Sequence, residues 1–177
     1  MKILLIQGSL RDRDGLFAAL EGAAEELRQT GLEAEIFRPI KTEGLICSGC
    51  GACKGAGMCI YDPRGQDFVK AAAACDGFLF AAPGSLFGLD VDMKNFLERV
   101  AALSPRRNPD PLAGKNAAAV VLCRRVGRAA GQMAALLRQL GLRLPEGREV
   151  PAVRGDESVQ TLCALARLLA EQIMTQA

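Results

Sequence analysis

The chain alternates short runs of apolar residues with longer stretches in which apolar residues recur at helical spacing. Residues 3–6 are apolar at every position, which is typical of a parallel strand buried on both faces. The following stretch repeats apolar residues at helical intervals from Leu16 to Leu27 and ends near Gly31, a residue suited to a helix C-terminus. The same pattern predicts further strands over residues 33–38, 77–82, 117–123 and 142–150, and further helices over residues 66–74, 91–103, 129–140 and 157–174.

This order of elements predicts a parallel sheet covered by helices on both faces. Right-handed crossovers favour a doubly wound, five-stranded parallel sheet in three α/β/α layers. We expect Pro83 to end the third strand, while Pro145 and Gly147 interrupt the pattern of the fifth. The length of 177 residues, half of them hydrophobic, suits one globular domain over residues 1–177.

Charge and composition exclude several classes of function. The formal net charge is +2 and the basic residues form no stripe, so we expect no nucleic-acid partner. No apolar run is long enough for a signal peptide or a membrane span, which predicts a cytoplasmic protein without a membrane partner. The absence of histidine excludes a histidine-dependent catalytic triad.

The strongest chemical signal is a group of four cysteines in the loop after the second strand, at about residues 41–62. Cys47, Cys50, Cys53 and Cys59 are separated by two, two and five residues, and most of the spacers are small. In a reducing compartment such a cluster indicates a metal or redox site, and a single 4Fe-4S cluster suits four closely spaced thiolates. Two alternatives are a structural zinc ion and a site that holds no metal. The other three cysteines, Cys75, Cys123 and Cys163, are expected to act as small hydrophobic residues.

A second candidate site follows the first strand. Gly8, Ser9 and Arg11 lie between this strand and the first helix, where free backbone N–H groups and a helix N-terminus favour a phosphate. In doubly wound sheets the loops after neighbouring strands meet at the same edge. The loop of residues 83–88 and the loop that begins at Arg124 should therefore lie beside the phosphate loop. One phosphate loop and two glycine-containing walls suit a flat aromatic cofactor such as FMN.

These motifs also carry a resemblance to a known family. They are Gly8-Ser9-x-Arg11, the run from Cys47 to Cys53 with Gly57-Met58-Cys59, Pro83 after the third strand, and Met93-Lys94-x-Phe96-Leu97-x-Arg99 on the next helix. Together they resemble the NADPH-dependent FMN reductase and iron-sulfur flavoprotein family, which has a flavodoxin-like fold. The resemblance implies FMN held by the three loops, with contacts from Ser9, Arg11, Gly15, Leu16, Phe17, Pro83, Gly84, Ser85, Leu86, Phe87, Gly88, Arg124, Gly127 and Gly131.

The chain departs from the family pattern at the phosphate loop and at the second loop. Leu10 occupies the position of a family proline, and Gly15-Leu16-Phe17 replaces the family sequence Gly-Asn-Thr. Ser85 stands where the family has an aromatic residue. The departures remove expected phosphate and flavin contacts, and they put flavin affinity in question.

Three hypotheses of function follow from the residues and the resemblance. The leading one is an iron-sulfur flavoprotein that passes electrons between an NAD(P)H or ferredoxin-type donor, FMN, the cluster and a small-molecule or protein acceptor. The second is an NAD(P)H-dependent FMN or quinone reductase without a cluster. The third is a flavin-free metal-binding or interaction module. The resemblance also implies a homodimer or homotetramer.

Overall fold

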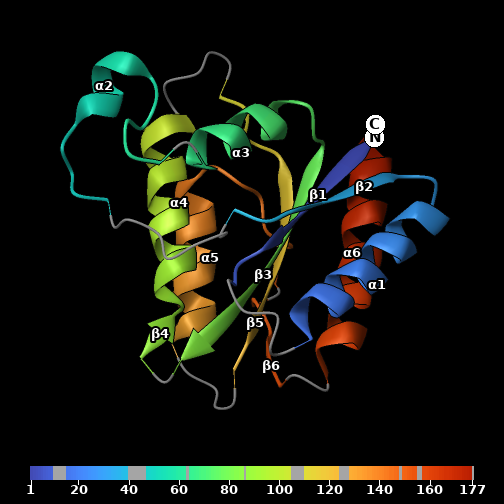
Figure 1. Cartoon of the computed structure of the whole chain (residues 1–177). Coiled ribbons are helices and arrows are strands. Elements are labelled where there is room, and N and C mark those ends of the chain that lie inside the picture. Colours follow the sequence, from blue (N-terminus) through green and yellow to red (C-terminus); the bar gives the residue numbers. More distant parts are fainter. Residues whose placement is uncertain are drawn as a thin grey trace.

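A twisted parallel sheet with strand order β2-β1-β3-β5-β6 runs through the centre of the protein (Figure 1). Its strands are β1 (Lys2–Gln7), β2 (Glu33–Phe37), β3 (Gly77–Ser85), β5 (Asn116–Leu122) and β6 (Ala152–Val153). A short strand, β4 (Gly88–Leu89), pairs antiparallel with the end of β3. The computed structural model describes residues 1–9, 15–39, 47–62, 64–85, 87–104, 110–123, 128–147, 149–154 and 157–176. The predicted doubly wound α/β fold is confirmed.

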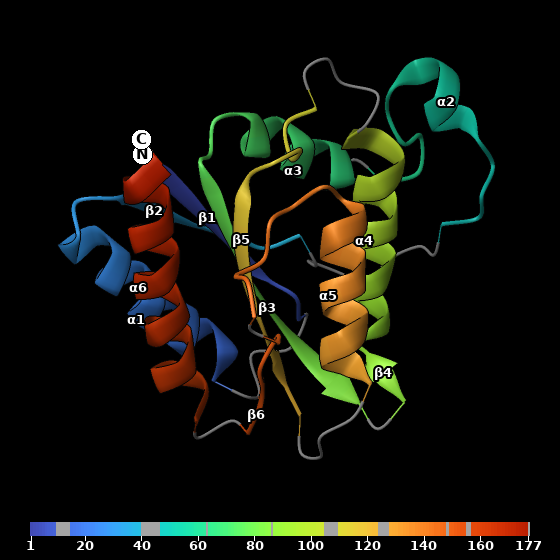
Figure 2. The ribbon, with the colours of Figure 1, turned by 180° about the vertical axis from the view of Figure 1, so that it is seen from behind.

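Helices cover both faces of the sheet, which gives the three predicted layers (Figures 1 and 2). One face carries α1 (Leu16–Gln29) and α6 (Ser158–Gln176). The other carries α3 (Arg64–Ala73), α4 (Val91–Leu103) and α5 (Ala129–Gln139). The short helix α2 (Ala52–Ala56) lies beside the C-terminal end of α4, away from the sheet. Among the residues described, no helix has the length and apolarity needed to cross a membrane.

The apolar strands explain the two layers of helices. Successive side chains of a strand point to opposite faces. In β1, Leu4 and Ile6 pack with α3, α4 and α5, whereas Ile3 and Leu5 pack with α1 and α6. All four side chains are fully buried, so the continuous apolar run of β1 supplies both halves of the core.

An aromatic cluster fixes α3 against the sheet. Phe68 of α3 is fully buried, and its ring centroid lies 5.2 to 6.3 Å from the rings of Phe37, Phe78, Phe80 and Phe96. The Phe68–Phe96 pair is edge-to-face, a favourable arrangement for aromatic rings. This cluster holds the start of α3, which follows the cysteine segment directly, in one position relative to α4.

The third strand is longer than the sequence predicts. We expected Pro83 to end it, but β3 continues to Ser85, and Pro83 still pairs in register with Leu122 of β5. Pro83 lacks an N–H, yet its carbonyl accepts a hydrogen bond from the N–H of Asp90 at 3.1 Å. The chain then turns back into β4, so the expected loop is in part a hairpin.

The fifth parallel strand is also placed differently. The prediction of a strand over residues 142–150 is wrong, because only Arg143 forms an isolated bridge, with Asn116, and the strand itself is Ala152–Val153. Pro145 and Gly147 break the predicted run, since proline offers no N–H to a ladder and glycine favours turns. Pairing resumes at Pro151, whose carbonyl accepts from the N–H of Val121 at 2.9 Å.

Candidate functional site

The first candidate site lies at the edge of the sheet where β1, β3 and β5 end. Gly8 comes directly after β1, and its N–H donates to the carbonyl of Ala81 in β3 at 2.7 Å. A Cβ atom at Gly8 would lie 2.7 Å from the Cβ of Ala82 and 3.1 Å from the Sδ of Met93 in α4. Only glycine therefore lets the start of the phosphate loop pass this close to β3 and α4.

Ser9 and the start of α1 form the described part of the predicted phosphate loop. Ser9 is buried, and Arg11 lies outside the described residues. Gly15 is the N-cap of α1, and as a glycine it has no side chain to accept hydrogen bonds from the first N–H groups of this 14-residue helix. The side chain of Leu16 is buried in the core, which leaves only its backbone N–H for a ligand, and Phe17 is half-buried beneath the Arg38 guanidinium.

An unpartnered polar side chain lies beside this loop. Gln7 is the last residue of β1 and is fully buried, yet within the described part of the chain neither its Nε2 nor its Oε1 has a hydrogen-bond partner. Burying an amide without partners costs free energy, so such a group is unusual in a strand. The sequence signal was a glutamine at the end of the apolar run before Gly8, and our sequence reasoning did not use it.

Gln132 of α5 contacts the second loop. Its Oε1 accepts a hydrogen bond from the N–H of Leu89 in β4 at 2.8 Å. Gly84 lies close to both β5 and α5, because a Cβ there would approach Val121 to 2.6 Å and Ala129 to 2.9 Å. The hairpin after β3 therefore packs directly on the N-terminal half of α5.

The remaining predicted contacts on these loops are only partly described. The Ser85 hydroxyl donates to the Gly88 carbonyl at 3.1 Å within the hairpin, and Phe87 between them is 86% exposed. Gly131 is exposed on α5. Three further predicted residues, Leu86, Arg124 and Gly127, lie outside the described residues.

The second candidate site is the cysteine segment of residues 47–62, which lies against the C-terminal end of α4. Its helix α2 is bounded by Gly51 and Gly57, whose φ angles of 73° and 63° are readily adopted only by glycine. The N–H of Gly57 donates to the carbonyl of Cys53 at 3.0 Å. These two glycines let the segment curl back so that cysteines before, within and after α2 line one cavity.

All four predicted ligands line one cavity of about 170 Å³ together with α4. Cys47 and Cys50 are exposed and Cys53 and Cys59 are half-buried, and all four are free thiols. A single water needs about 10–15 Å³, so the cavity has room for a polyatomic group. Within the described residues, no three cysteine or acidic side chains are arranged to hold one metal ion. What the four cysteines share is the wall of this cavity.

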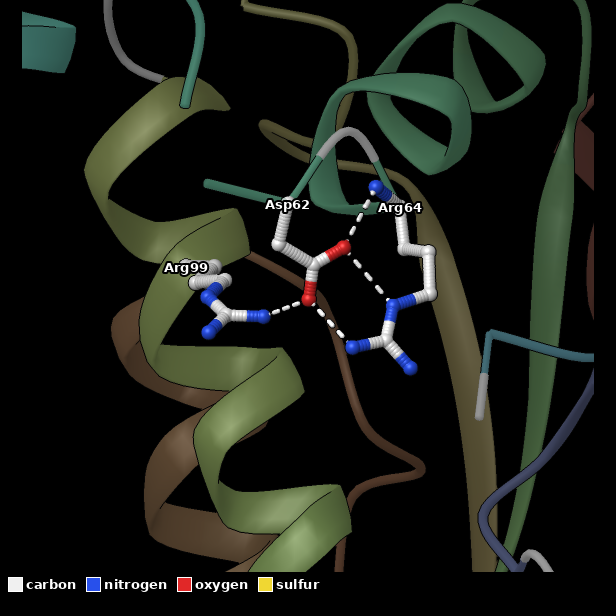
Figure 3. Close-up of polar contacts among 3 residues, drawn as sticks. All are labelled: Asp62, Arg64 and Arg99. Carbon is white, nitrogen blue, oxygen red and sulfur yellow. Dashed lines mark hydrogen bonds and ion pairs between the residues drawn. The ribbon is translucent and has the colours of Figure 1, made fainter. Parts of the chain in front are cut away.

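A buried ionic cluster, absent from our sequence analysis, lies where the cysteine segment joins α3 (Figure 3). Asp62, three residues after Cys59, is 4% exposed. Its Oδ1 accepts from the backbone N–H of Arg64 at 3.0 Å and from the Nε of Arg64 at 2.7 Å. Its Oδ2 pairs with Arg64 and with Nη1 of Arg99 on α4. One carboxylate thus joins two guanidinium groups from two helices.

Arg99 belongs to both the ionic cluster and the cysteine cavity. It is 6% exposed and lines the cavity with Ala102 and Leu103, and its Nε has no hydrogen-bond partner among the described residues. The sequence offered a signal for it, since Arg99 closes the motif on this helix that carries the family resemblance. Its partner Asp62 could not be identified without the fold, because the two are 37 positions apart.

The three other cysteines differ from the four in their surroundings. Cys75 is buried, and its Sγ donates to the carbonyl of Ala71 at 3.3 Å. Burial raises the pKa of the Cys75 thiol, although Lys2 and Lys115 act in the opposite direction. Burial likewise raises the pKa of Cys163, which is half-buried on α6. A raised pKa keeps these thiols protonated and unreactive.

Comparison with known proteins gives a consistent picture. A family model described as NADPH-dependent FMN reductase matches residues 1–153. A protein of Archaeoglobus fulgidus named iron-sulfur flavoprotein is 27% identical over 179 residues, covering 97% of this chain and 80% of that protein.

Two solved structures share the fold. One is FerB from Paracoccus denitrificans, described as a flavoenzyme NAD(P)H:(acceptor) oxidoreductase, with a TM-score of 0.67 and 15% identity over 98% of this chain and 97% of that one. The other is a flavodoxin from the domain Archaea, with a TM-score of 0.66 and 13% identity over 98% of this chain and 99% of that one. At these identities the two structures support the flavodoxin-like fold alone.

Proposed function

The chain belongs to the family of NADPH-dependent FMN reductases and is an NAD(P)H-dependent flavin oxidoreductase, and from this premise we propose that it is an iron-sulfur flavoprotein. In this proposal FMN binds at the strand edge formed by the loops after β1, β3 and β5. A 4Fe-4S cluster binds to Cys47, Cys50, Cys53 and Cys59. The protein then passes electrons between a nicotinamide or ferredoxin-type donor, the flavin and the cluster.

The described residues of the strand edge fit FMN. Gly8 allows the loop to pass close to β3, and the N-terminus of α1 offers first-turn N–H groups, without a side-chain cap from Gly15, to a phosphate. Gln7 contributes a buried amide without a partner at the same edge, and such an amide suits a polar group of a ligand. When bound, FMN accepts two electrons as a hydride and can release them singly. The chain's own residues hold and orient the cofactor.

The cysteine cavity supports the cluster half of the proposal. Four free thiols surround a space that a polyatomic group can occupy, and the segment carries glycines that let backbone N–H groups approach sulfur. The relative from Archaeoglobus fulgidus, which carries iron-sulfur in its name, matches 97% of the chain. The shared cavity of the four cysteines is the single observation that carries this part of the proposal.

The two proposed sites lie at opposite ends of α4. The helix begins at Val91, after its N-cap Asp90 and the β3–β4 hairpin, and ends at Leu103, which lines the cysteine cavity. Thirteen residues of α-helix span about 20 Å. Because the sites share no described residue, a substitution in one is expected to leave binding at the other intact.

Analysis of the bound cofactors tests the proposal directly. The protein is purified without air, its visible spectrum is recorded, and FMN, iron and zinc are measured per chain. Flavin with about four irons per chain supports the iron-sulfur flavoprotein. Flavin without iron supports the reductase without a cluster, and zinc or neither cofactor supports the flavin-free module. The homodimer or homotetramer stays a prediction, which light scattering on the same sample tests.

A further inference from the structure

In the ionic cluster beside the cysteine cavity, two guanidinium groups share one carboxylate. Asp62 is the carboxylate that pairs with both Arg64 and Arg99, so the three ionised side chains together carry a charge of +1. Asp92 lines a small neighbouring cavity with these residues. Burying an excess charge is costly unless an opposite charge lies near.

Arg99 lines both the small cavity beside Asp62 and the cysteine cavity. Its side chain is 7% exposed and rises from the last two turns of α4, the part of the helix that forms the wall of the cysteine cavity. Its Nη1 is paired with Asp62 (Figure 3). Its buried Nε has no hydrogen-bond partner in the part of the chain that the structure describes. A buried N–H donor without a partner suits an acceptor that the protein itself does not supply.

We propose that Arg99, held in place by Asp62, is a tuning residue that raises the reduction potential of the cluster in the cysteine cavity. This inference rests on the proposed function, because it requires a cluster at the four cysteines. A cluster held by four thiolates is anionic, and reduction adds one electron and no proton, which makes it more negative. A positive charge at the wall of the cavity therefore stabilises the reduced form. The electron comes from reduced flavin in the protein, or from dithionite in the test below.

The expected size of the effect follows from Coulomb's law. At an effective dielectric constant of about 20, two unit charges less than about 12 Å apart change a one-electron equilibrium at least tenfold. Arg99 lines the same 170 Å³ cavity as the cysteines. Loss of its charge should thus lower the equilibrium constant for reduction about tenfold, which equals about 59 mV.

A purely structural role for the ion pair makes a different prediction. If Arg99 and Asp62 only tied the cysteine segment to α4, removal of either partner would loosen the segment in the same way, and the potential would move in the same direction. In the electrostatic role the two substitutions act in opposite directions. Arg99→Met removes a positive charge and lowers the potential, whereas Asp62→Asn removes a negative charge and raises it.

The test is a potentiometric titration with dithionite, followed by electron paramagnetic resonance on the full chain purified without air. Wild type is compared with Arg99→Met, Arg99→Lys and Asp62→Asn. Lys94→Met is the matched control, because Lys94 is an exposed cation on the same helix that lies 3.8 Å from Glu98. We expect the equilibrium constant for reduction of the cluster to fall about tenfold in Arg99→Met and to rise in Asp62→Asn. It should change less than twofold in Arg99→Lys and in Lys94→Met.

The outcomes separate failure of this inference from failure of the proposed function. Wild type without iron overturns both. Wild type with four irons and a potential that Arg99→Met leaves unchanged, or shifts in parallel with Asp62→Asn, overturns the tuning role alone. If Asp62→Asn does not fold, the comparison of Arg99→Met with Arg99→Lys decides, since equal potentials in these two variants contradict a role for the charge.

Discussion

Asp62 and Arg99 form a buried ion pair between the end of the cysteine segment and α4. The pair joins two parts of the chain that are 37 positions apart. Arg64 at the start of α3 forms a second ion pair with Asp62. Because Phe68 fixes α3 in the aromatic cluster, Asp62 is attached to a rigid base. The cysteine segment is thereby anchored at its C-terminal end.

This arrangement predicts unequal costs for removing the two partners. Asp62→Asn removes the carboxylate that the buried Arg99 and the half-buried Arg64 share, and we expect a loss of about 3–5 kcal/mol in the free energy of unfolding. Arg99→Met leaves Asp62 paired with Arg64, so its cost should be clearly smaller. Urea denaturation of the two variants measures both values. An equal or greater cost for Arg99→Met would contradict the shared pairing of Asp62.

The close approach of Gly8 to β3 and α4 predicts a local cost of adding a methyl group. Gly8→Ala would bring Cβ within 2.7 Å of the Ala82 Cβ, and overpacking of this kind costs about 1–3 kcal/mol. Gly22→Ala on α1 is the matched control, since its Cβ would meet only ordinary contacts at 3.8 Å or more. Alanine in a helix is favoured over glycine by about 0.5–1 kcal/mol, so the control should gain stability. Similar losses of stability in both variants would contradict steric crowding as the reason for glycine at position 8.

Much of the fold could be predicted from the sequence, because long periodic segments report burial directly. The strands β1, β2 and β5 and the helices α1, α4, α5 and α6 lie within about two residues of their predicted bounds. The β3–β4 hairpin was missed because two-residue β4 has no periodicity and depends on Gln132, 43 positions after Leu89. The fifth strand was misplaced because its two residues carry less signal than the apolar residues before them.

In the candidate sites too, local sequence patterns could be recognised and contacts between distant residues could not. The four cysteines could be recognised because they are metal-binding residues that lie close together in the sequence. In the structure they line one cavity. Gly8 and Ser9 could be recognised because they follow a strand. Asp62 and Arg99 could not be paired in advance, because their contact depends on how α3 and α4 pack.

The buried thiol of Cys75 predicts a pH dependence of stability. Burial raises the pKa of this thiol above its ordinary value of 9.0. As the pH rises through 9, the unfolded chain loses the proton while the folded chain retains it. The unfolded state then binds fewer protons, so the free energy of unfolding falls with pH, by at most about 1.4 kcal/mol per pH unit.

The comparison that checks this linkage uses Cys75→Ala. We expect the difference in unfolding free energy between wild type and Cys75→Ala to be constant up to about pH 8 and to shrink between pH 9 and 10. Chemical denaturation under reducing conditions at each pH gives the two values. If the difference in unfolding free energy instead grows between pH 9 and 10, it contradicts a raised pKa of the Cys75 thiol in the folded protein.

The phosphate loop predicts an effect of Arg11 on cofactor retention. Arg11→Ala should remove a charge-assisted hydrogen bond to the FMN phosphate, which corresponds to about 1.5–3 kcal/mol or roughly 10- to 100-fold in Kd. Arg138→Ala, an exposed arginine at the end of α5, is the control and should bind FMN as wild type does. Fluorescence titration of the flavin-free protein with FMN measures both. Equal affinity of Arg11→Ala and wild type would remove Arg11 from the site.

The most direct test of the two separate sites is the iron and FMN content of Cys50→Ser beside that of Cys163→Ser, both purified without air. Cys50 lines the cysteine cavity, whereas Cys163 lies half-buried on α6. The account predicts about four irons and one FMN per chain in wild type and in Cys163→Ser. It predicts FMN without iron in Cys50→Ser. Iron retained in Cys50→Ser, or iron and FMN lost together in that variant, would contradict a cluster at the four cysteines that is separate from the flavin.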